Sequence, residues 1–434
     1  MIQTELPVPR RRLLISAFAF DSAGGSEAGL GWQVARRLAR HHDVTVLFGH
    51  LRPGTRAPEN LRQLDAACEA EGGITPVLIE GAPFAKFLAA LNHKPGLWWL
   101  YYHAYRLWQK QALEKARELH REKPFDLVHH VNIIGYREPG YLWQLGIPFF
   151  WGPISGTPMV PWAFLKTFGP GQFYRWGSRN LANAWQMRTS RRCKAAARAA
   201  AKIWAVSESD RRMVTDHWGC DAEHLLETGG EPSASPITRC RRPEEPLRIL
   251  WSGRFDPIKV LPVLLDALSG ITRHPWELHI LGDGPEKRRW KRHESRTTFT
   301  GNIHWHGMIP RSKALEIMAT GHVFVHTSVK EGTPHVVVEA LCLGIPVICH
   351  DACGMGIAVD SRCGLKVPLA DPAASVEGFR SALLRLIEEP QLLETLSRGA
   401  FARASELDWD TKVKRFLAAY SEALVSDPTE GTGT

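Results

Sequence analysis

The run from Lys330 to Ala340 combines two carboxylates with a glycine and a proline, and these residue types can bind a polar ligand. Gly332 lets the backbone approach a ligand closely. Pro334 suits the first turn of a helix, whose next free N–H groups point at an anion. Glu331 precedes this helix and Glu339 lies inside it, where each can accept hydrogen bonds from hydroxyl groups. A ligand with sugar hydroxyls at both ends and phosphates between them, a nucleotide sugar, fits this pattern.

Two other loops carry residues suited to phosphate groups. Gly253, Arg254 and Lys259 follow an apolar strand on one loop. Two cations at the carboxyl end of a strand fit a diphosphate better than a carboxylate. Gly282-Asp283-Gly284-Pro285 makes a tight turn after another strand, and we expect this turn to line the same cleft.

These motifs, in this order and at these spacings, resemble the retaining glycosyltransferases of the family-4 type, which have the GT-B fold of two Rossmann-like domains. The resemblance also includes Gly344-Ile345-Pro346-Val347-Ile348 and covers roughly residues 247 to 425. The first half agrees more weakly, through Gly24-Gly25-Ser26-Glu27 and the stretch from Asp126 to Gly156. The latter stretch is similar to bacterial members that build surface polysaccharides.

The resemblance implies roles by position. Arg254 and Lys259 would bind and neutralise the departing diphosphate of the donor. Glu331 would contact the donor hexose, and Glu339 would bind the ribose diol. The implied catalytic residues are Glu331, Lys259, Arg254 and His130, and the implied donor-binding residues are Gly24, Gly25, Gly253, Arg254, Lys259, Gly282, Gly332, Thr333, Pro334, His335 and Glu339.

Enzymes of this kind need no metal, because paired cations and a helix N-terminus stabilise the developing charge. We therefore expect no metal and no cofactor, the nucleotide diphosphate sugar being a substrate. The chain departs from the family pattern at two loops. Val260 follows Lys259 where the family usually has glycine, and Glu227-Thr228-Gly229-Gly230-Glu231 replaces the usual Pro-Asn-Gly. These departures concern loop geometry and leave the class of enzyme unchanged.

Histidines at two places could contribute to the site. His129 and His130 end a strand where the family often has a histidine near the sugar or the acceptor. Adjacent side chains alternate across a strand, so only one of the two can face the cleft, and we favour His130. His326 and His335 lie near the Glu331 motif, and His335 is the stronger candidate of the two.

The elements around these residues alternate between strand and helix. Leu13–Phe20, residues 27–40 and Val44–Phe48 form a strand–helix–strand unit, and the pattern recurs from residue 248 onward. Such alternation predicts an α/β protein with parallel sheets that face a cleft. The expected organisation is a Rossmann-like acceptor-side domain at 1–228, a linker at 229–246, a Rossmann-like nucleotide-sugar domain at 247–407, and a C-terminal helix with a short tail at 408–434 that could pack back on the first domain.

The net charge of +9 has a local origin. No Asp or Glu occurs between Pro139 and Ser207, whereas nine Lys or Arg do, and the rest of the chain has 45 basic and 45 acidic residues. This distribution argues against bulk nucleic-acid binding, and no nucleic-acid-binding motif is present. The same stretch is rich in aromatic residues, which either build a core or form a surface for anionic lipid. The second possibility would suit a lipid-linked acceptor.

The sequence also indicates a compartment. The eight cysteines include no C-x-x-C pair and no zinc spacing, as expected for reduced thiols in the cytoplasm. Arg10-Arg11-Arg12 precedes a short apolar run that fits a first strand better than a signal peptide. No run is long enough for a membrane span. We expect a cytoplasmic protein, either free or peripheral on the inner face of the membrane.

The leading hypothesis is an enzyme that moves a hexose from a nucleotide diphosphate sugar to a sugar or lipid-linked sugar hydroxyl, with retention of configuration. Its product would be a surface polysaccharide or a glycolipid. The alternative is a non-transferring GT-B enzyme such as a nucleotide-sugar epimerase, which would process the donor with no acceptor present.

Overall fold

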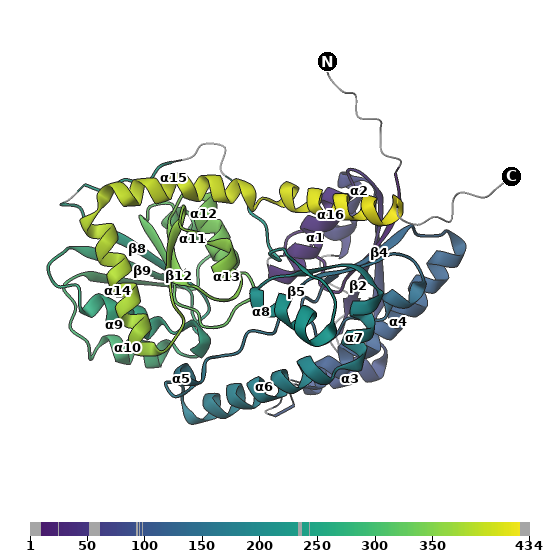
Figure 1. Cartoon of the computed structure of the whole chain (residues 1–434), viewed down its shortest axis with the longest axis horizontal. Coiled ribbons are helices and arrows are strands. Elements are labelled where there is room, and N and C mark those ends of the chain that lie inside the picture. The colour runs from purple at the N-terminus through teal and green to yellow at the C-terminus, as the bar shows by residue number, and fades with distance from the viewer. Residues whose placement is uncertain are drawn as a thin grey trace, which may run out of the picture.

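The computed structural model describes residues 10–425, apart from residues 25, 52–60, 93, 95, 98, 233–236 and 243. It contains two parallel β-sheets with helices on both faces of each, side by side along the longest axis of the molecule (Figure 1). This arrangement confirms the predicted α/β class with two Rossmann-like sheets.

The first sheet has seven strands in the order β3-β2-β1-β4-β5-β6-β7, and all its neighbouring strands are parallel. Its central strands are buried on both faces, which explains why they are almost continuously apolar. The strands are β1 (Arg12–Ala17), β2 (Asp43–His50), β3 (Ile74–Glu80), β4 (Leu127–Asn132), β5 (Phe149–Ile154), β6 (Ala200–Ala205) and β7 (Glu223–His224).

Helices connect these strands, and all of them except α5 cover the faces of the first sheet. They are α1 (Ser26–Leu38), α2 (Leu61–Glu71), α3 (Pro83–Leu91), α4 (Leu100–Glu122), η1 (Leu142–Leu145), α5 (Trp162–Leu165), α6 (Pro170–Thr189), α7 (Arg191–Ala199), α8 (Glu208–Arg212) and η2 (Met213–Trp218). Ser207 caps α8, because its side chain accepts a hydrogen bond from the Asp210 amide.

The second sheet has six parallel strands in the order β10-β9-β8-β11-β12-β13. Its strands are β8 (Leu247–Ser252), β9 (Trp276–Leu281), β10 (Asn302–Gly307), β11 (Val323–His326), β12 (Val347–His350) and β13 (Gly364–Val367). The helices that come after β8 in the chain are η3 (Pro257–Lys259), α9 (Leu261–Ser269), α10 (Lys287–Glu294), α11 (Arg311–Met318), α12 (His335–Cys342), α13 (Cys353–Ala358), α14 (Pro372–Glu388), α15 (Pro390–Glu406) and α16 (Trp409–Val425).

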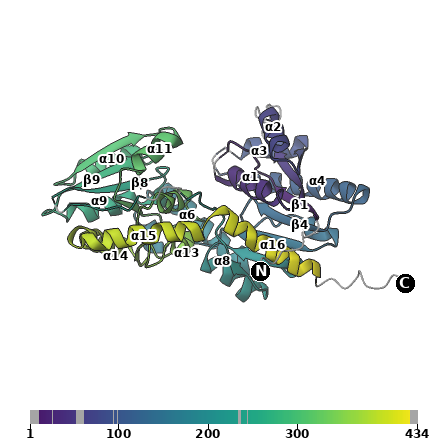
Figure 2. The same ribbon diagram turned by 90° about the horizontal axis from the view of Figure 1, so that it is seen from above.

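Each sheet receives a helix from the other half of the chain. The last helix, α16, leaves the second sheet and lies beside α1 and β4 of the first sheet, as Figures 1 and 2 both show. Its Phe416 and Tyr420 are buried in the core that contains β1 and β2. In return, Phe164 and Leu165 of α5 are buried in the core that contains β8 and α9. The two sheets therefore share their cores through these exchanged helices.

The predicted strand–helix–strand unit is present with small differences. The first strand ends at Ala17 rather than at Phe20, because the chain turns there toward α1. The sequence did not predict β3, which contains Pro76. Proline cannot donate to a sheet ladder, and β3 tolerates it because it is the edge strand.

Candidate active site between the two sheets

Glu331 lies in the loop between β11 and α12, and most of its side chain is buried. The Lys259 ammonium contacts its carboxylate directly, and the His326 Nε2 atom lies 3.7 Å from the carboxylate Oε1 atom. Burial raises the pKa of Glu331, but attraction to Lys259 and His326 outweighs it and lowers the pKa to about 2. Glu331 is therefore an ionised hydrogen-bond acceptor at neutral pH and does not serve as a proton donor.

The loop after β8 carries both predicted cations, in different environments. Lys259 is largely buried against Glu331, whereas the Arg254 side chain is 72% exposed and pairs with Asp256 at 3.2 Å. Val260 has a φ of 35°, a left-handed conformation that a β-branched residue rarely adopts. The backbone at this position is thus left-handed, a conformation that glycine adopts without strain and that this chain adopts with a strained valine.

The predicted turn after β9 lies against the Arg254 loop. Gly282 has a φ of 127°, and a Cβ atom there would collide with the Gly253 carbonyl. The Gly253 amide donates to the Leu281 carbonyl at 3.0 Å, and the Phe255 amide donates to the Asp283 carbonyl at 3.0 Å. The loops after two neighbouring strands therefore form one surface at the carboxyl edge of the sheet.

Gly332 and Thr333 lie against a carboxyl group that the sequence did not single out. The Thr333 amide donates to Glu227 Oε1 at 3.0 Å, and a Cβ atom on Gly332 would collide with the same carboxyl group. Burial raises the pKa of Glu227 to about 8. Its Oε2 atom and the Thr333 hydroxyl have no hydrogen-bond partner among the described residues. The only sequence signal was the departure of residues 227–231 from the family's Pro-Asn-Gly.

Pro334 is the N-cap residue of α12, the helix that His335 opens and that contains Glu339. His335 Nδ1 lies 2.9 Å from the Thr228 hydroxyl, and burial lowers its pKa, so its ring is neutral at pH 7. Glu339 accepts hydrogen bonds from Arg311 at 2.6 and 2.9 Å. A ribose diol would have to share or replace this ion pair.

The predicted role of His130 does not agree with the structure. His129 and His130 point to opposite faces of β4, as alternation requires, but both are fully buried. His129 contacts the Tyr420 hydroxyl at 2.6 Å and the Gly152 carbonyl at 2.7 Å. His130 contacts the Ser16 hydroxyl at 3.2 Å. Burial lowers both pKa values, to about 3 and about 4, so these are neutral core histidines.

A cavity of about 330 Å³ separates the two sheets at this point, and both halves of the chain line it. Glu331 and Gly332 line it from the second half, together with Lys330, whose ammonium donates to the Pro158 carbonyl. Glu27, at the start of α1, lines the opposite side and accepts from the Ile134 amide at 3.3 Å. Neither His129 nor His130 lines this cavity.

Two predicted residues lie at the start of α1. Gly24 is packed against Asp21 and Ala28, and it does not line the cavity. Gly25 lies outside the described residues. Glu27 is therefore the residue that brings this loop to the cavity, three positions beyond the first glycine. The sequence contained it only as the last member of the Gly24–Glu27 motif.

Potential metal ligands come together elsewhere, on the paired strands β9 and β10. Glu277, His279 and His304 place one ligand atom each within 4.8 Å of one another. None of the three lines the cavity between the sheets.

Comparisons with known proteins show which proteins this chain is similar to. Residues 238–402 match the family model of the glycosyl transferases group 1. The chain is 27% identical over 214 residues to a D-inositol 3-phosphate glycosyltransferase of Streptomyces griseus, covering 46% of this chain and 44% of that protein. It is 27% identical over 254 residues to the same kind of protein from Acidothermus cellulolyticus, covering 51% and 55%. The chain thus spans about half the length of the curated relatives it matches.

Solved structures are similar over nearly the whole chain. A sucrose-phosphate synthase from Thermosynechococcus elongatus has a TM-score of 0.63 at 17% identity, covering 96% of this chain and 100% of that one. HepE of Anabaena in complex with UDP and glucose has a TM-score of 0.57 at 16% identity, covering 95% and 100%. At these identities the likeness establishes the fold.

Proposed function

From the GT-B fold of this chain and the group 1 glycosyl transferase match of its second half, we propose a hexosyltransferase. It moves a hexose from a nucleotide diphosphate sugar to a sugar or lipid-linked sugar hydroxyl, with retention of configuration and without a metal. The observation that carries this proposal is the buried Glu331, which lines the cavity between the sheets and pairs with Lys259 behind it.

Each group in the pair has a distinct task. Glu331 is ionised and buried, so it accepts hydrogen bonds from the hexose hydroxyls and fixes the orientation of the ring. Lys259, with the exposed Arg254 on the same loop, neutralises the diphosphate as the bond to the anomeric carbon breaks. The similar HepE structure holds UDP and glucose, which supports a nucleotide sugar as the donor.

The direct test measures transfer and donor binding in two variants. Glu331→Ala and Lys259→Ala should lower transfer from a nucleotide sugar by at least 100-fold, as expected when one electrostatic contact in the transition state is lost. Lys313→Ala changes an exposed lysine on α11 and should behave as the wild type. Normal turnover in both cleft variants would overturn the proposal, as would release of an epimerised donor in the absence of acceptor.

Retention and metal independence have separate tests. The anomeric configuration of the product, read from its proton NMR coupling constant, should equal that of the donor. Chelation with EDTA should leave the rate unchanged. An inverted product or loss of activity after chelation would contradict the corresponding part of the proposal.

We further propose that α5 and α6 place the enzyme on an anionic membrane, on the cytoplasmic side. Trp162 and, on α6, Phe173, Tyr174 and Trp185 are all more than 40% exposed. Arg175 and Arg188 of α6 are exposed as well. Rings at headgroup depth beside cations fit an anionic lipid surface. Among the described residues, no helix has the length and apolar character needed to cross a bilayer.

Other parts of the acid-free stretch do not contribute to this surface. Phe149, Phe150 and Trp151 form the buried strand β5. Arg192 and Lys202 pair with Glu138 and Glu223, which lie outside the stretch. These residues belong to the core or to ion pairs, so the proposed membrane surface does not include them.

Vesicle sedimentation tests this surface. Wild-type protein should bind vesicles that contain phosphatidylglycerol and should not bind phosphatidylcholine vesicles. Arg175→Glu with Arg188→Glu should lower the binding at least tenfold, because each cation near an anionic surface contributes about 1 kcal/mol. A double variant that binds like the wild type would rule out this surface.

A further inference from the structure

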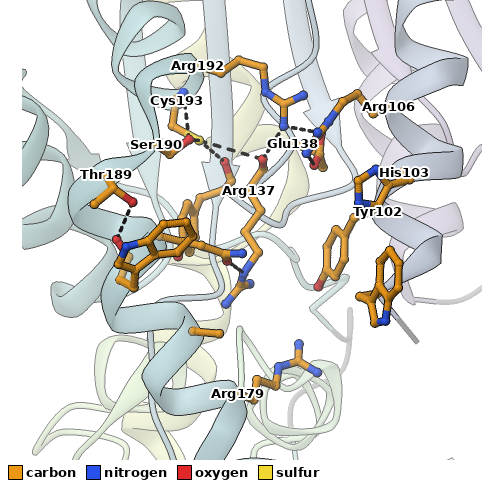
Figure 3. A pocket seen from close by; sticks show the side chains of 15 residues that line it. Tyr102, His103, Arg106, Arg137, Glu138, Arg179, Thr189, Ser190, Arg192 and Cys193 are labelled. Carbon is orange, nitrogen blue, oxygen red and sulfur yellow. Dashed lines mark hydrogen bonds and ion pairs between the residues drawn. The ribbon is translucent and has the colours of Figure 1, made fainter. Parts of the chain in front are cut away.

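A second cavity lies within the first half of the chain, beside the cavity between the sheets. Its volume is about 360 Å³. Figure 3 shows Tyr102, His103 and Arg106 of α4 on one wall and Arg179 and Thr189 of α6 on the other. The two cavities share lining residues, so they adjoin; these are Tyr102, Arg137, Glu138 and Arg179.

This second cavity carries an excess of positive charge. Four arginines and one carboxylate line it, the arginines being Arg106, Arg137, Arg179 and Arg192. Glu138 is buried and accepts hydrogen bonds from Arg106 at 2.7 Å and from Arg192 at 2.5 Å. The carboxylate is therefore already engaged by two of the arginines, as the dashed lines in Figure 3 show.

Arg137 has neutral partners instead. Its guanidinium donates to the side-chain oxygens of Gln186, at 2.8 Å, and of Asn183, and it stacks on the Tyr136 ring. Amide oxygens hold the guanidinium in place without cancelling its charge. Arg137 therefore keeps its full positive charge at the point where the two cavities adjoin.

Arg179 and Lys330 bring two more cations to the same place. Burial lowers the pKa of Lys330 to about 8, and repulsion from Arg179 and Arg137 adds to this effect. Burial also lowers the pKa of Arg179, as does repulsion from Arg137, against an opposing effect of Tyr102. Three cations from separate elements that repel one another across a shared space favour an anion between them.

Aromatic side chains line the remainder of the cavity. Tyr102 lies on α4 and Trp99 immediately precedes that helix, while Trp185 lies on α6. Trp99 and Trp185 are 45% and 67% exposed, so they form the rim. Flat apolar rings beside donors of hydrogen bonds suit the face of a sugar ring.

We propose that this second cavity is the acceptor subsite and that it selects an acceptor bearing a phosphate group. The phosphate lies between Arg137 and Arg179, and the sugar ring lies against Tyr102 and the tryptophans. The reacting hydroxyl extends into the adjoining cavity toward Glu331. This inference rests on the proposed function. A free sugar phosphate and a sugar linked to lipid through a diphosphate offer the same anionic group.

Calorimetric titration tests the subsite, with saturating UDP present so that the donor site is occupied. The probes are glucose 1-phosphate, glucose 6-phosphate and a detergent-solubilised undecaprenyl diphosphate hexose, each compared with glucose. At least one phosphorylated probe should bind at least tenfold more tightly than glucose. Arg137→Gln and Arg179→Gln should each weaken that binding at least tenfold, since a charge-assisted hydrogen bond is lost. Arg117→Gln, an exposed position on α4 outside the cavity, should not.

Every outcome of this titration bears on the subsite. If only the lipid-linked probe binds, the acceptor is membrane-borne; if free sugar phosphates bind, it is soluble. The subsite is refuted if no phosphorylated probe binds better than glucose, if Arg179→Gln matches Arg117→Gln, or if the probes displace UDP. The affinity of the wild type for UDP distinguishes failure of the subsite from failure of the proposed function. A wild-type protein that binds no nucleotide and no nucleotide sugar would contradict the proposed function itself.

Discussion

Replacement of Glu227 by glutamine should change how stability depends on pH. Glu227 is buried behind Gly332, and burial raises its pKa from 4.5 to about 8. The folded protein therefore holds a proton at neutral pH that the unfolded chain releases above pH 4.5. Because the folded state binds more protons, the free energy of unfolding falls as the pH rises through this range.

The size of the effect follows from the two pKa values. The free energy of unfolding should fall by about 1.4 kcal/mol for each pH unit well inside the window, and less near pH 8 where the folded protein also loses the proton. Between pH 6 and pH 8 the loss should be about 2 kcal/mol. Glutamine has no such proton, yet its side-chain oxygen can still accept from the Thr333 amide.

Urea unfolding, followed by tryptophan fluorescence at pH 6 and pH 8, measures this difference. The wild type should lose about 2 kcal/mol more than Glu227→Gln. The buried Lys412 interacts electrostatically with Glu227, so the difference between the two proteins reports the loss of the Glu227 proton together with the accompanying change in the pKa of Lys412. Glu316→Gln changes an exposed carboxylate on α11 and should follow the wild type. If wild type and Glu227→Gln lose stability in parallel, the assignment of a buried proton to Glu227 is wrong.

Three more outcomes follow from individual contacts. Tyr420→Phe removes the hydroxyl 2.6 Å from His129 and should lower the free energy of unfolding by about 1–3 kcal/mol, measured by urea unfolding; an unchanged midpoint would contradict the buried hydrogen bond. Phe164→Ala should lower the free energy of unfolding by about 3–5 kcal/mol. Although the residue lies in the first half of the chain, hydrogen exchange should become faster in the core of the second sheet. Lys259→Met removes the cation that lowers the pKa of Glu331, so donor affinity should be lost at a higher pH than in the wild type as the solution is acidified. If a binding titration finds the same pH dependence in both proteins, Lys259 does not control the ionisation of Glu331.

The sequence predicted the parts of the site that are close together along the chain or that follow strands of one sheet. Arg254, Gly282 and Glu331 all follow strands of the second sheet, so an alternating pattern was enough to bring them to one edge. Lys259 and Glu331 are in contact because the strands before them, β8 and β11, are neighbours. Local pattern and topology together therefore determine this half of the site.

The residues that the sequence did not reveal depend on contacts between distant segments. Glu227 contacts Thr333 across 106 positions, and nothing in its own neighbourhood marks it as buried. Arg137 lies in the loop after β4 and Arg179 on α6, and only the tertiary fold brings both to one cavity. The prediction for His130 failed for the same reason. Its place near the end of a strand suggested that it faces the cleft, but distant segments that the local sequence pattern does not reveal bury it.

The position of α16 has a consequence for biosynthesis. Residues 409–425 leave the ribosome only after the whole second sheet, yet they cover β4 and complete the core around Trp204 and Phe150. Until then, the nascent first half presents those aromatic side chains to solvent or to chaperones. Emergence of α16, rather than emergence of the first sheet, is therefore the event that closes that core. A gene cut between the two halves would yield a first fragment that lacks its own final helix.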